Sequence, residues 1–378
     1  MALTKKMEEY ASAVREEVIQ LVRDMCRIPA PSNHEELRAE FCRKWFADNG
    51  FENVYVDEAL NVIAPLNDTG DNDLMVVMAH TDTVFPDMEP MEVVEKDGFM
   101  YCPGVGDDTA NLAVLMICAR YYKDNCPDNE GILFVANSGE EGLGNLKGTR
   151  KLMEFYGSRV KNFVSLDSAC MHRLVVQAVG SHRYKVTART EGGHSFGNFG
   201  NRNAIHVLAT MISALYSVNV PKEGNSKTTF NVGTIEGGTS VNTIAQEASM
   251  MYEYRSDNKN CLDKMKVFFD RTIDMFKASG VEIELEMLGE RPCMSEMKDP
   301  AGYSALKKRA VDSMHEISGL DVIEGSSSTD CNIPFSMGIS AVCFGVVRSK
   351  GAHTREEKIE IASLYDGCRL LLDFLYRR

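Results

Sequence analysis

The stretch that decides the fold is LMVVMAHTDTVFP, residues 74–86. It opens with a short, nearly continuous apolar run over residues 74–79, and the polar residues His80 and Asp82 follow directly. A run of this kind is typical of a strand buried on both faces, as in a parallel sheet that helices cover. Three more runs of the same kind are found at residues 132–136, 163–166 and 341–344. Because a helical stretch, residues 112–122, separates the first two runs, we predict an α/β fold, an open sheet with helices on both faces.

The N-terminal region is predicted to be mainly helical. Apolar residues at helical spacing predict a helix over residues 8–27, which must end at the prolines of residues 28–31. Ser32 followed by Glu35 predicts a capping box for the next helix.

The middle of the chain has a different pattern from about Val179 onward. Strand, helix, strand, strand, helix and strand are predicted in this order, at residues 183–190, 204–217, 228–235, 247–254, 261–279 and 281–287. The order β-α-β-β-α-β is that of ferredoxin-like α+β domains. We therefore expect a catalytic domain in two parts, residues 1–178 and 290–378, interrupted by an inserted domain at residues 179–289.

The composition excludes several classes of protein. The 378 residues include 41 basic and 55 acidic side chains, and the net charge of -14 argues against a nucleic-acid partner, whose binding depends on clustered Lys and Arg. No apolar run approaches the roughly 20 residues needed to cross a bilayer, and the first residues mix both charge signs, unlike a secretory signal. The 11 cysteines form no CxxC pair, which favours reduced core thiols over a disulfide scaffold. We therefore expect a cytoplasmic protein without a nucleic-acid or membrane partner.

Candidate catalytic and metal-binding residues lie just after the predicted buried strands, where open α/β sheets bind their ligands. His80 and Asp82 share a face if the strand geometry persists, so Asp82 can fix the tautomer of a metal-binding His80; the alternative is a structural hydrogen bond that caps the strand. Asp107 and Asp108 stand between a Gly-rich turn and a helix, where they are either ligands or an N-cap. A nucleotide loop is disfavoured here, because the third glycine and the Walker lysine are missing.

The remaining candidates are carboxylates at strand ends and one loop histidine. Glu140 and Glu141 are adjacent, so their side chains diverge: one suits a metal and the other a general base, unless both belong to a solvated acidic turn. Asp167 ends an apolar strand, where a carboxylate is costly unless it is paired or ligated. His353 precedes the last helix, and taken alone it is an ordinary loop histidine.

Together these residues predict a site for two metal ions. Two histidines and three carboxylates suit borderline cations such as Zn²⁺. Two dications set against Asp107, Glu141 and Asp167 leave one positive charge, which favours a bridging hydroxide, the nucleophile of two-metal hydrolases. One carboxylate must then bridge both ions, and one further carboxylate should remain as the base.

The order of these motifs resembles a known family. HTD, GVGDD, SGEEG, SLDSA and a late AHT, interrupted by a ferredoxin-like insert, look like the co-catalytic metallopeptidases. That family includes peptidase T, carboxypeptidase G, cytosolic dipeptidases and succinyl-diaminopimelate desuccinylase, and HTDTVFP looks closest to the peptidase T-like branch. The resemblance spans nearly the whole chain. Thr109 and Ala110 stand where the family often has lysine and glycine, and neither residue is a proposed ligand.

The resemblance implies five metal ligands, which are His80, Asp107, Glu141, Asp167 and His353. His80 and Asp167 would hold one metal, Glu141 and His353 would hold the other, and Asp107 would bridge them. Asp82 would orient His80, and Glu140 would be the general base that moves a proton from the water to the leaving amine. The cofactor would be two Zn²⁺ per subunit, with Co²⁺ and Mn²⁺ as alternatives.

The same resemblance gives the insert a role. EGGHSFGNFGNRNAI, residues 191–205, resembles the family's dimerisation segment, in which a histidine reaches the partner subunit's active site. His194 fits this role and would polarise the oxyanion. Asn242 and Arg255 would bind the carbonyl or carboxylate of the substrate, and the planar fork of an arginine matches a carboxylate. A homodimer formed through the insert is implied.

We predict from these features a di-metal hydrolase that cleaves the amide bond of small peptides, similar to a di- or tripeptide aminopeptidase. The nearest alternative is a deacylase of N-acyl amino acids (acetyl, succinyl or carbamoyl) with the same catalytic residues and a different pocket. A non-catalytic binding protein of the same fold is a third option. A dinucleotide-dependent oxidoreductase is disfavoured, because the sequence lacks GxGxxG.

Overall fold

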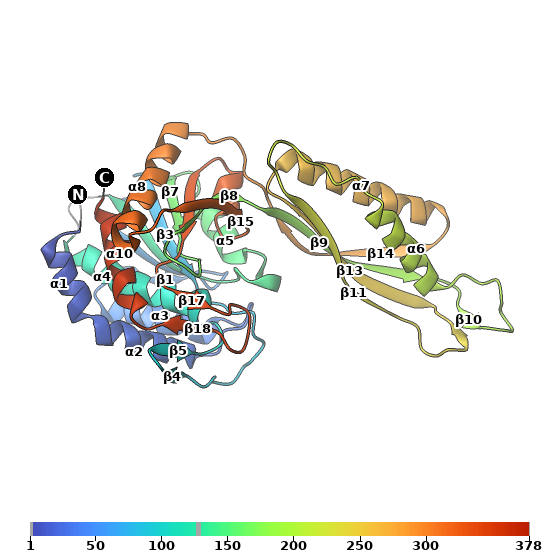
Figure 1. Cartoon of the computed structure of the whole chain (residues 1–378), viewed down its shortest axis with the longest axis horizontal. Coiled ribbons are helices and arrows are strands. Elements are labelled where there is room, and N and C mark those ends of the chain that lie inside the picture. Colours follow the sequence, from blue (N-terminus) through green and yellow to red (C-terminus); the bar gives the residue numbers. More distant parts are fainter. Residues whose placement is uncertain (1–2, 126–129, 378) are drawn as a thin grey trace. The chain divides into compact units, whose positions relative to one another are not determined.

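The computed structural model describes residues 3–125 and 130–377, and these divide into two compact units (Figure 1). The first unit is formed by Met1–Ala178 with Ser295–Arg378, and the second by Val179–Met294. The sequence placed the end of the insert at residue 289, but strand β14 (Glu282–Arg291) continues past that position. The chain then returns to the first unit.

The first unit is built on a mixed sheet with the strand order β1-β2-β6-β3-β7-β16-β8-β15. Its strands are β1 (Tyr55–Val56), β2 (Val62–Leu66), β3 (Leu74–His80), β6 (Gly131–Asn137), β7 (Val160–Ser165), β8 (Arg173–Ala178), β15 (Ile323–Ser327) and β16 (Ser340–Phe344). The four predicted apolar runs are the central neighbours β6, β3, β7 and β16, which pair in parallel. Every residue of β3, β6 and β16 is buried, which confirms strands covered on both faces.

Helices lie against both faces of this sheet. On one face α4 (Ala110–Asn125) and α10 (Ser363–Tyr376) share a core with Val77 and Val342. Met78 points to the opposite face, since neighbouring strand residues alternate, and its sulfur lies 3.6 Å from the Thr149 hydroxyl of α5 (Lys147–Tyr156). The other helices of this unit are α1 (Lys5–Ala13), α2 (Arg15–Cys26), α3 (Glu36–Asp48), α8 (Pro300–Ser318) and α9 (Asn332–Ser336). The predicted fold class is confirmed.

Two predictions near the N-terminus are wrong in detail. The single helix expected over residues 8–27 is two helices, α1 and α2, which meet at Val14. The expected capping box is absent, because α3 has no side-chain cap. The Ser32 hydroxyl instead donates to Asp82 at 2.7 Å, and Glu35 accepts from Asn33 N and Lys147 Nζ at 2.9 Å each. The Ser32 hydroxyl and the Glu35 carboxylate thus form other hydrogen bonds in place of the expected cap.

A small sheet with the order β17-β18-β5-β4 was not predicted, because its strands are very short. The strands are β4 (Val94–Lys96), β5 (Phe99–Tyr101), β17 (Ser349–Lys350) and β18 (Lys358–Glu360). β5 and β18 pair antiparallel, with Lys358 opposite Tyr101. This pairing joins the chain that leads to Asp107 with the chain that follows His353.

The second unit is an antiparallel sheet with the order β11-β13-β9-β14. Its elements are β9 (Gly180–Arg189), β10 (Gly193–His194), α6 (Ala204–Tyr216), β11 (Thr228–Gly237), β12 (Thr243–Ile244), β13 (Glu247–Ser256), α7 (Lys259–Ala278) and β14. Side chains of α6 and α7 share one core with the sheet residues Val186 and Tyr252. Apart from the short β10 and β12, the order of elements is the predicted β-α-β-β-α-β. Every helix in the described parts of both units is too short or too polar to cross a lipid bilayer.

Candidate metal centre

His80 is the last residue of β3, and its ring is held from both sides. Its Nε2 lies 3.0 Å from Asp107 Oδ1. Its Nδ1 lies 3.0 Å from the main-chain oxygen of Asp82 and 3.5 Å from the carboxylate of that residue. Both ring nitrogens thus face acceptors, which favours a proton on each in the absence of metal. A cation that replaces the proton on Nε2 would bind its lone pair, while Nδ1 keeps its proton on the Asp82 oxygen.

The carboxylate of Asp82 is fully buried, and it mainly fixes the main chain of the two neighbouring glutamates. Oδ1 accepts from the backbone N–H of Glu140 at 3.0 Å, and Oδ2 accepts from that of Glu141 at 3.0 Å. Ser32 donates a third hydrogen bond to Oδ2. The sequence predicted that Asp82 orients His80. The structure adds that it links the end of β3 to the loop after β6, which carries Glu140 and Glu141.

Asp107 faces both histidines with its two carboxylate oxygens. Oδ1 lies 3.0 Å from His80 Nε2, and Oδ2 lies 3.1 Å from His353 Nε2. Asp108 is not an N-cap of α4, because its carboxylate accepts from the backbone N–H of His80 at 2.9 Å and from the side-chain amide of Asn111 at 2.6 Å. Of the two aspartates at this turn, only Asp107 is therefore in a position to join two cations.

His353 and Glu141 lie next to each other beside Asp107. His353 Nε2 is 2.9 Å from Glu141 Oε1, and the residue has a φ of 65°, which turns the loop after β17 toward the sheet. One ring nitrogen thus faces carboxylates from two different loops. This arrangement is what a second metal position beside Asp107 requires.

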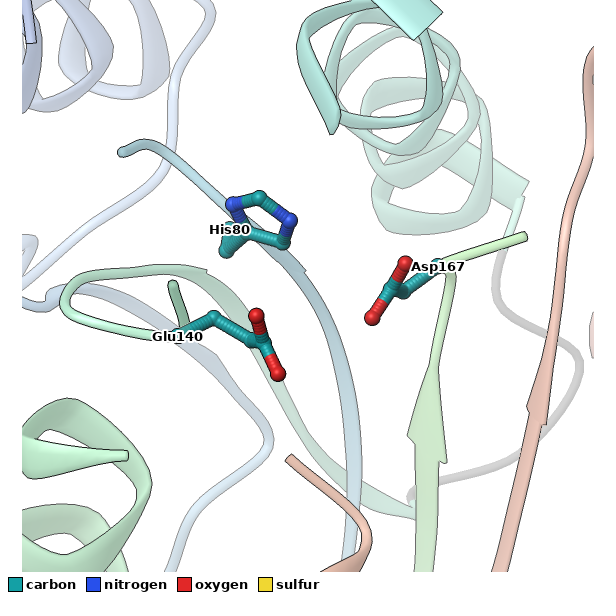
Figure 2. A group of neighbouring side chains, drawn as sticks. All are labelled: His80, Glu140 and Asp167. Carbon is teal, nitrogen blue, oxygen red and sulfur yellow. The ribbon is translucent and has the colours of Figure 1, made fainter. Parts of the chain in front are cut away.

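Glu140 and Asp167 form a group with His80, in which one potential ligand atom from each residue lies within 4.8 Å of the others. Figure 2 shows the three side chains coming from separate segments, with the two carboxylates turned toward a common space beside the histidine. His80, Asp107 and Glu141 form a second such group. His80 and the six other predicted residues of this unit therefore meet at the carboxyl ends of β3, β6 and β7 and on the loops that carry Asp107 and His353.

The electrostatics of this site favour positive charge. Burial alone would lower the pKa of His80, but hydrogen bonds to Asp107 and Asp82 raise it well above its usual range. Hydrogen bonds to Asp107 and Glu141 raise the pKa of His353 to about 10. Burial and the neighbouring charges of Asp107 and Glu140 raise the pKa of Asp167 well above its usual range. Imidazole nitrogens and several carboxylates are a donor set that fits zinc and similar cations, so the residues fit the predicted metals.

Two residues at this site were missed from the sequence. Ser32 was assigned to a helix cap, and Glu357 was not singled out, although its buried carboxylate accepts from the backbone of the Asp107 loop. The only available signal for Glu357 was a carboxylate in the segment after His353. Glu357 could not be linked to the Asp107 loop from the sequence, because the two residues are 250 positions apart.

His194, Asn242 and Arg255 belong to the second unit, and the structure brings only the first two together. β10 and β12 pair His194 with Thr243, and the N–H of Ser195 donates to the main-chain oxygen of Asn242 at 2.9 Å. Arg255 is near the other end of β13, which spans roughly 25 Å between Glu247 and Arg255 at about 3.3 Å per residue. Figure 1 shows β10 beyond the end of the sheet at which β13 begins.

Arg255 lies beside two other arginines. Register places Arg255, Ser181 and Arg291 next to one another on β13, β9 and β14, with Arg183 two residues along β9. Arg255 binds Glu253 through Nε at 3.0 Å and Nη2 at 2.9 Å. Burial and the charges of Arg291 and Arg255 lower the pKa of Arg183. Glu253 also lies 3.3 Å from Arg183, so one carboxylate is already bound among these arginines.

Replacing Asp82 by Asn tests its role at the junction of β3 and the Glu140 loop. The amide cannot accept from all three donors, so we expect Asp82→Asn to lower the free energy of unfolding by about 2–4 kcal/mol. The exposed Asp73 precedes the same strand, and Asp73→Asn should change stability by less than about 0.5 kcal/mol. Urea unfolding followed by circular dichroism measures both values, and an equal effect of the two substitutions would contradict the assigned role.

A sequence model of the peptidase family M20/M25/M40 matches residues 76–377. Succinyl-diaminopimelate desuccinylase of Nitrosomonas eutropha is 26% identical over 317 residues, which cover 78% of this chain and 80% of that protein.

Solved structures share the fold. A tripeptidase from Staphylococcus aureus has a TM-score of 0.74 at 23% identity, covering 95% of this chain and 97% of that one. A dinuclear metal-binding peptidase from Bacillus subtilis has a TM-score of 0.65 at 15% identity, covering 96% and 98%. The chain therefore belongs to the peptidase family M20/M25/M40 and is a hydrolase of the metallopeptidase type.

Proposed function

We propose that this protein is a two-metal hydrolase that cleaves the amide bond of di- and tripeptides. The observation that carries the proposal is the placement of Asp107, whose two oxygens face two different histidines at 3.0 and 3.1 Å. A carboxylate in that position can share its oxygens between two cations. His80 and Asp167 would hold one ion, and Glu141 and His353 the other.

Zinc is the proposed metal, because imidazole and carboxylate donors suit it, with Co²⁺ and Mn²⁺ as alternatives. When bound, the ions would polarise the scissile carbonyl and lower the pKa of a water molecule. The chain's own residues then fix the geometry. Asp82 holds the main chain of Glu140 and Glu141, so that the base and the ligand keep separate directions.

Glu140 is the proposed general base. Its side chain is buried and belongs to the group that also contains His80 and Asp167. It would take a proton from the attacking water and deliver it to the leaving amine nitrogen. Glu141, whose oxygen faces His353, would remain a ligand.

His194 is proposed as the donor to the oxyanion. Its Nδ1 accepts from the backbone N–H groups of Phe196 at 3.3 Å and Gly197 at 3.2 Å. The neutral ring therefore carries its proton on Nε2, which is the form that can donate a hydrogen bond. Arg255 and Asn242 are the proposed contacts for a substrate carboxylate and carbonyl.

The distance within the second unit favours a homodimer with shared sites. A tripeptide is roughly 10 Å long at about 3.5 Å per residue, so it cannot reach both His194 and Arg255 of one copy across roughly 25 Å. The loop of His194 also exposes Phe196 and Phe199, at 90% and 91% of their surface. Within the described chain β11 pairs with β13 alone, so the other edge of β11 can pair with a second copy. We therefore assign His194, and Asn242 beside it, to the active site of the partner subunit.

The alternative substrates are N-acyl amino acids. The similarity to a desuccinylase and the arginines around Ser181 favour a substrate with a carboxylate, which peptides and acyl amino acids both carry. The reaction is the same in both cases. A cytoplasmic location is part of the proposal, and it rests on the sequence alone.

Hydrolysis of a di- and tripeptide panel set beside an N-acetyl, N-succinyl and N-carbamoyl amino acid panel tests the proposal. Zinc-loaded protein should hydrolyse peptides faster, and removal of the metal by a chelator should abolish turnover until zinc is restored. Faster hydrolysis of the acyl amino acids would support the deacylase instead. A protein that binds no metal and cleaves neither panel would contradict both.

The roles of the adjacent glutamates can be separated by matched substitutions. We expect Glu140→Gln to retain two metals per subunit and to lower kcat by about 10²–10⁴-fold, because only the proton carrier is lost. Glu141→Gln should lose metal, and excess zinc should restore part of its activity. Elemental analysis and steady-state kinetics give both readouts. If Glu140→Gln loses metal while Glu141→Gln keeps it, the two roles are reversed.

Mixed dimers test whether His194 acts across the interface. Glu140→Gln and His194→Ala should each be nearly inactive alone. In a co-expressed mixture, half of the dimers pair one variant with the other, and each of these has one complete site, so about a quarter of the wild-type activity should return. If His194 serves its own subunit, no site is complete and no activity returns.

A further inference from the structure

Glu357 lies behind the loop that presents Asp107. Its side chain is fully buried. Oε2 accepts from the backbone N–H of Gly104 at 2.8 Å, and Oε1 accepts from those of Gly106 at 2.7 Å and Asp107 at 2.9 Å. One carboxylate thus binds three N–H groups of a single turn, including that of Asp107 itself.

The position of Glu357 follows from the small sheet. β18 begins at Lys358, which lies opposite Tyr101 of β5, so Glu357 lies beside Cys102, and the N–H of Cys102 donates to the main-chain oxygen of Glu357 at 3.2 Å. The chain from β5 runs on into the Asp107 loop, and the chain before β18 carries His353. Glu357 therefore connects the two loops that provide these residues.

The three hydrogen bonds decide where the Asp107 side chain points. An aspartate in a turn commonly accepts from backbone N–H groups nearby. Here Glu357 takes the N–H groups of Gly106 and Asp107, and both Asp107 oxygens face the histidines. The turn is also closely packed, because a Cβ on Gly106 would collide with the side chain of Ser349, and one on Gly104 would lie 2.5 Å from Thr83 Cγ2.

We infer that Glu357 is the positioning residue for Asp107, and that it sets the affinity of the site for its metal pair. The inference rests on the metal site proposed above. Glu357 is not a ligand in this account, since both of its oxygens already accept backbone hydrogen bonds. It acts through Asp107, by holding the turn in the form in which one carboxylate faces both His80 and His353.

Glu357→Gln tests the inference, with Glu356→Gln as the matched control on the neighbouring exposed residue. A glutamine has one acceptor oxygen, and its NH₂ group would oppose a backbone N–H. Loss of a group that orients a ligand typically weakens metal binding by about 10–100-fold, so we expect the zinc Kd of Glu357→Gln to rise by that factor. Glu357→Asp keeps the charge but not the full reach, and its Kd should lie between those of the wild type and Glu357→Gln. Glu356→Gln should bind zinc like the wild type.

Zinc Kd is measured by competition with a chelator, below the Tm of each metal-free variant, and kcat and KM are measured at saturating zinc. A raised zinc Kd would support positioning, because a general loss of structure lowers the fraction of active protein, and with it the apparent kcat, without changing the zinc affinity of the folded fraction. A wild-type zinc Kd in Glu357→Gln would overturn the inference. If that variant does not fold, a wild-type Kd in Glu357→Asp overturns it. Failure of the wild-type protein to bind zinc would instead contradict the proposed function.

Discussion

Four carboxylates lie together at the carboxyl edge of the central sheet, and their mutual repulsion must be offset for the chain to fold. Asp107, Glu140, Glu141 and Asp167 come from three loops and surround the ring of His80. Burial and this crowding raise the pKa of Asp167, which shows that the site disfavours one more negative charge. Two imidazoles offset part of the charge, and divalent cations offset more of it. The repulsion between these carboxylates disfavours the site without metal, and it also favours the binding of cations. Bound metal would therefore stabilise the folded chain.

The buried carboxylates at this edge fall into two kinds, which their partners distinguish. Asp107 and Glu141 have imidazole nitrogens as neighbours, so their oxygens face the space where cations would lie. Asp82 and Glu357 accept mainly from backbone N–H groups. Their carboxylates therefore stabilise the main chain of the loops and do not face the cation space. A loop would otherwise be the most mobile part of the fold. These hydrogen bonds hold the main chain of the loops that carry the candidate ligands.

The sequence predicted the central strands and the polar residues that meet at the carboxyl edge of the sheet because both depend on local pattern. An apolar run such as residues 74–79 identifies a buried strand, and the polar residue after it must lie at the carboxyl edge. The contacts that Ser32, Asp82 and Glu357 make with distant loops could not be obtained in this way. Their partners are 50 to 253 residues away in the chain, and they depend on which loops the fold brings together. Ser32 is an example. Its hydroxyl could cap the next helix or bind a distant carboxylate, and in the structure it donates to Asp82.

The residues assigned to the two units differ in hydrogen-bonding character. Those of the first unit are carboxylates and imidazole lone pairs, which accept protons or bind cations. Those of the second, His194 with its proton on Nε2, Asn242 and Arg255, can donate. Amide hydrolysis needs both kinds, because the proton of the attacking water must be accepted while the oxyanion and the substrate carboxylate need donors. The separation of roughly 25 Å along β13 prevents one second unit from supplying all these donors to one small substrate. Under the proposed function, a complete site would draw its donors from two copies of the chain, and association of the subunits would then be a condition of catalysis.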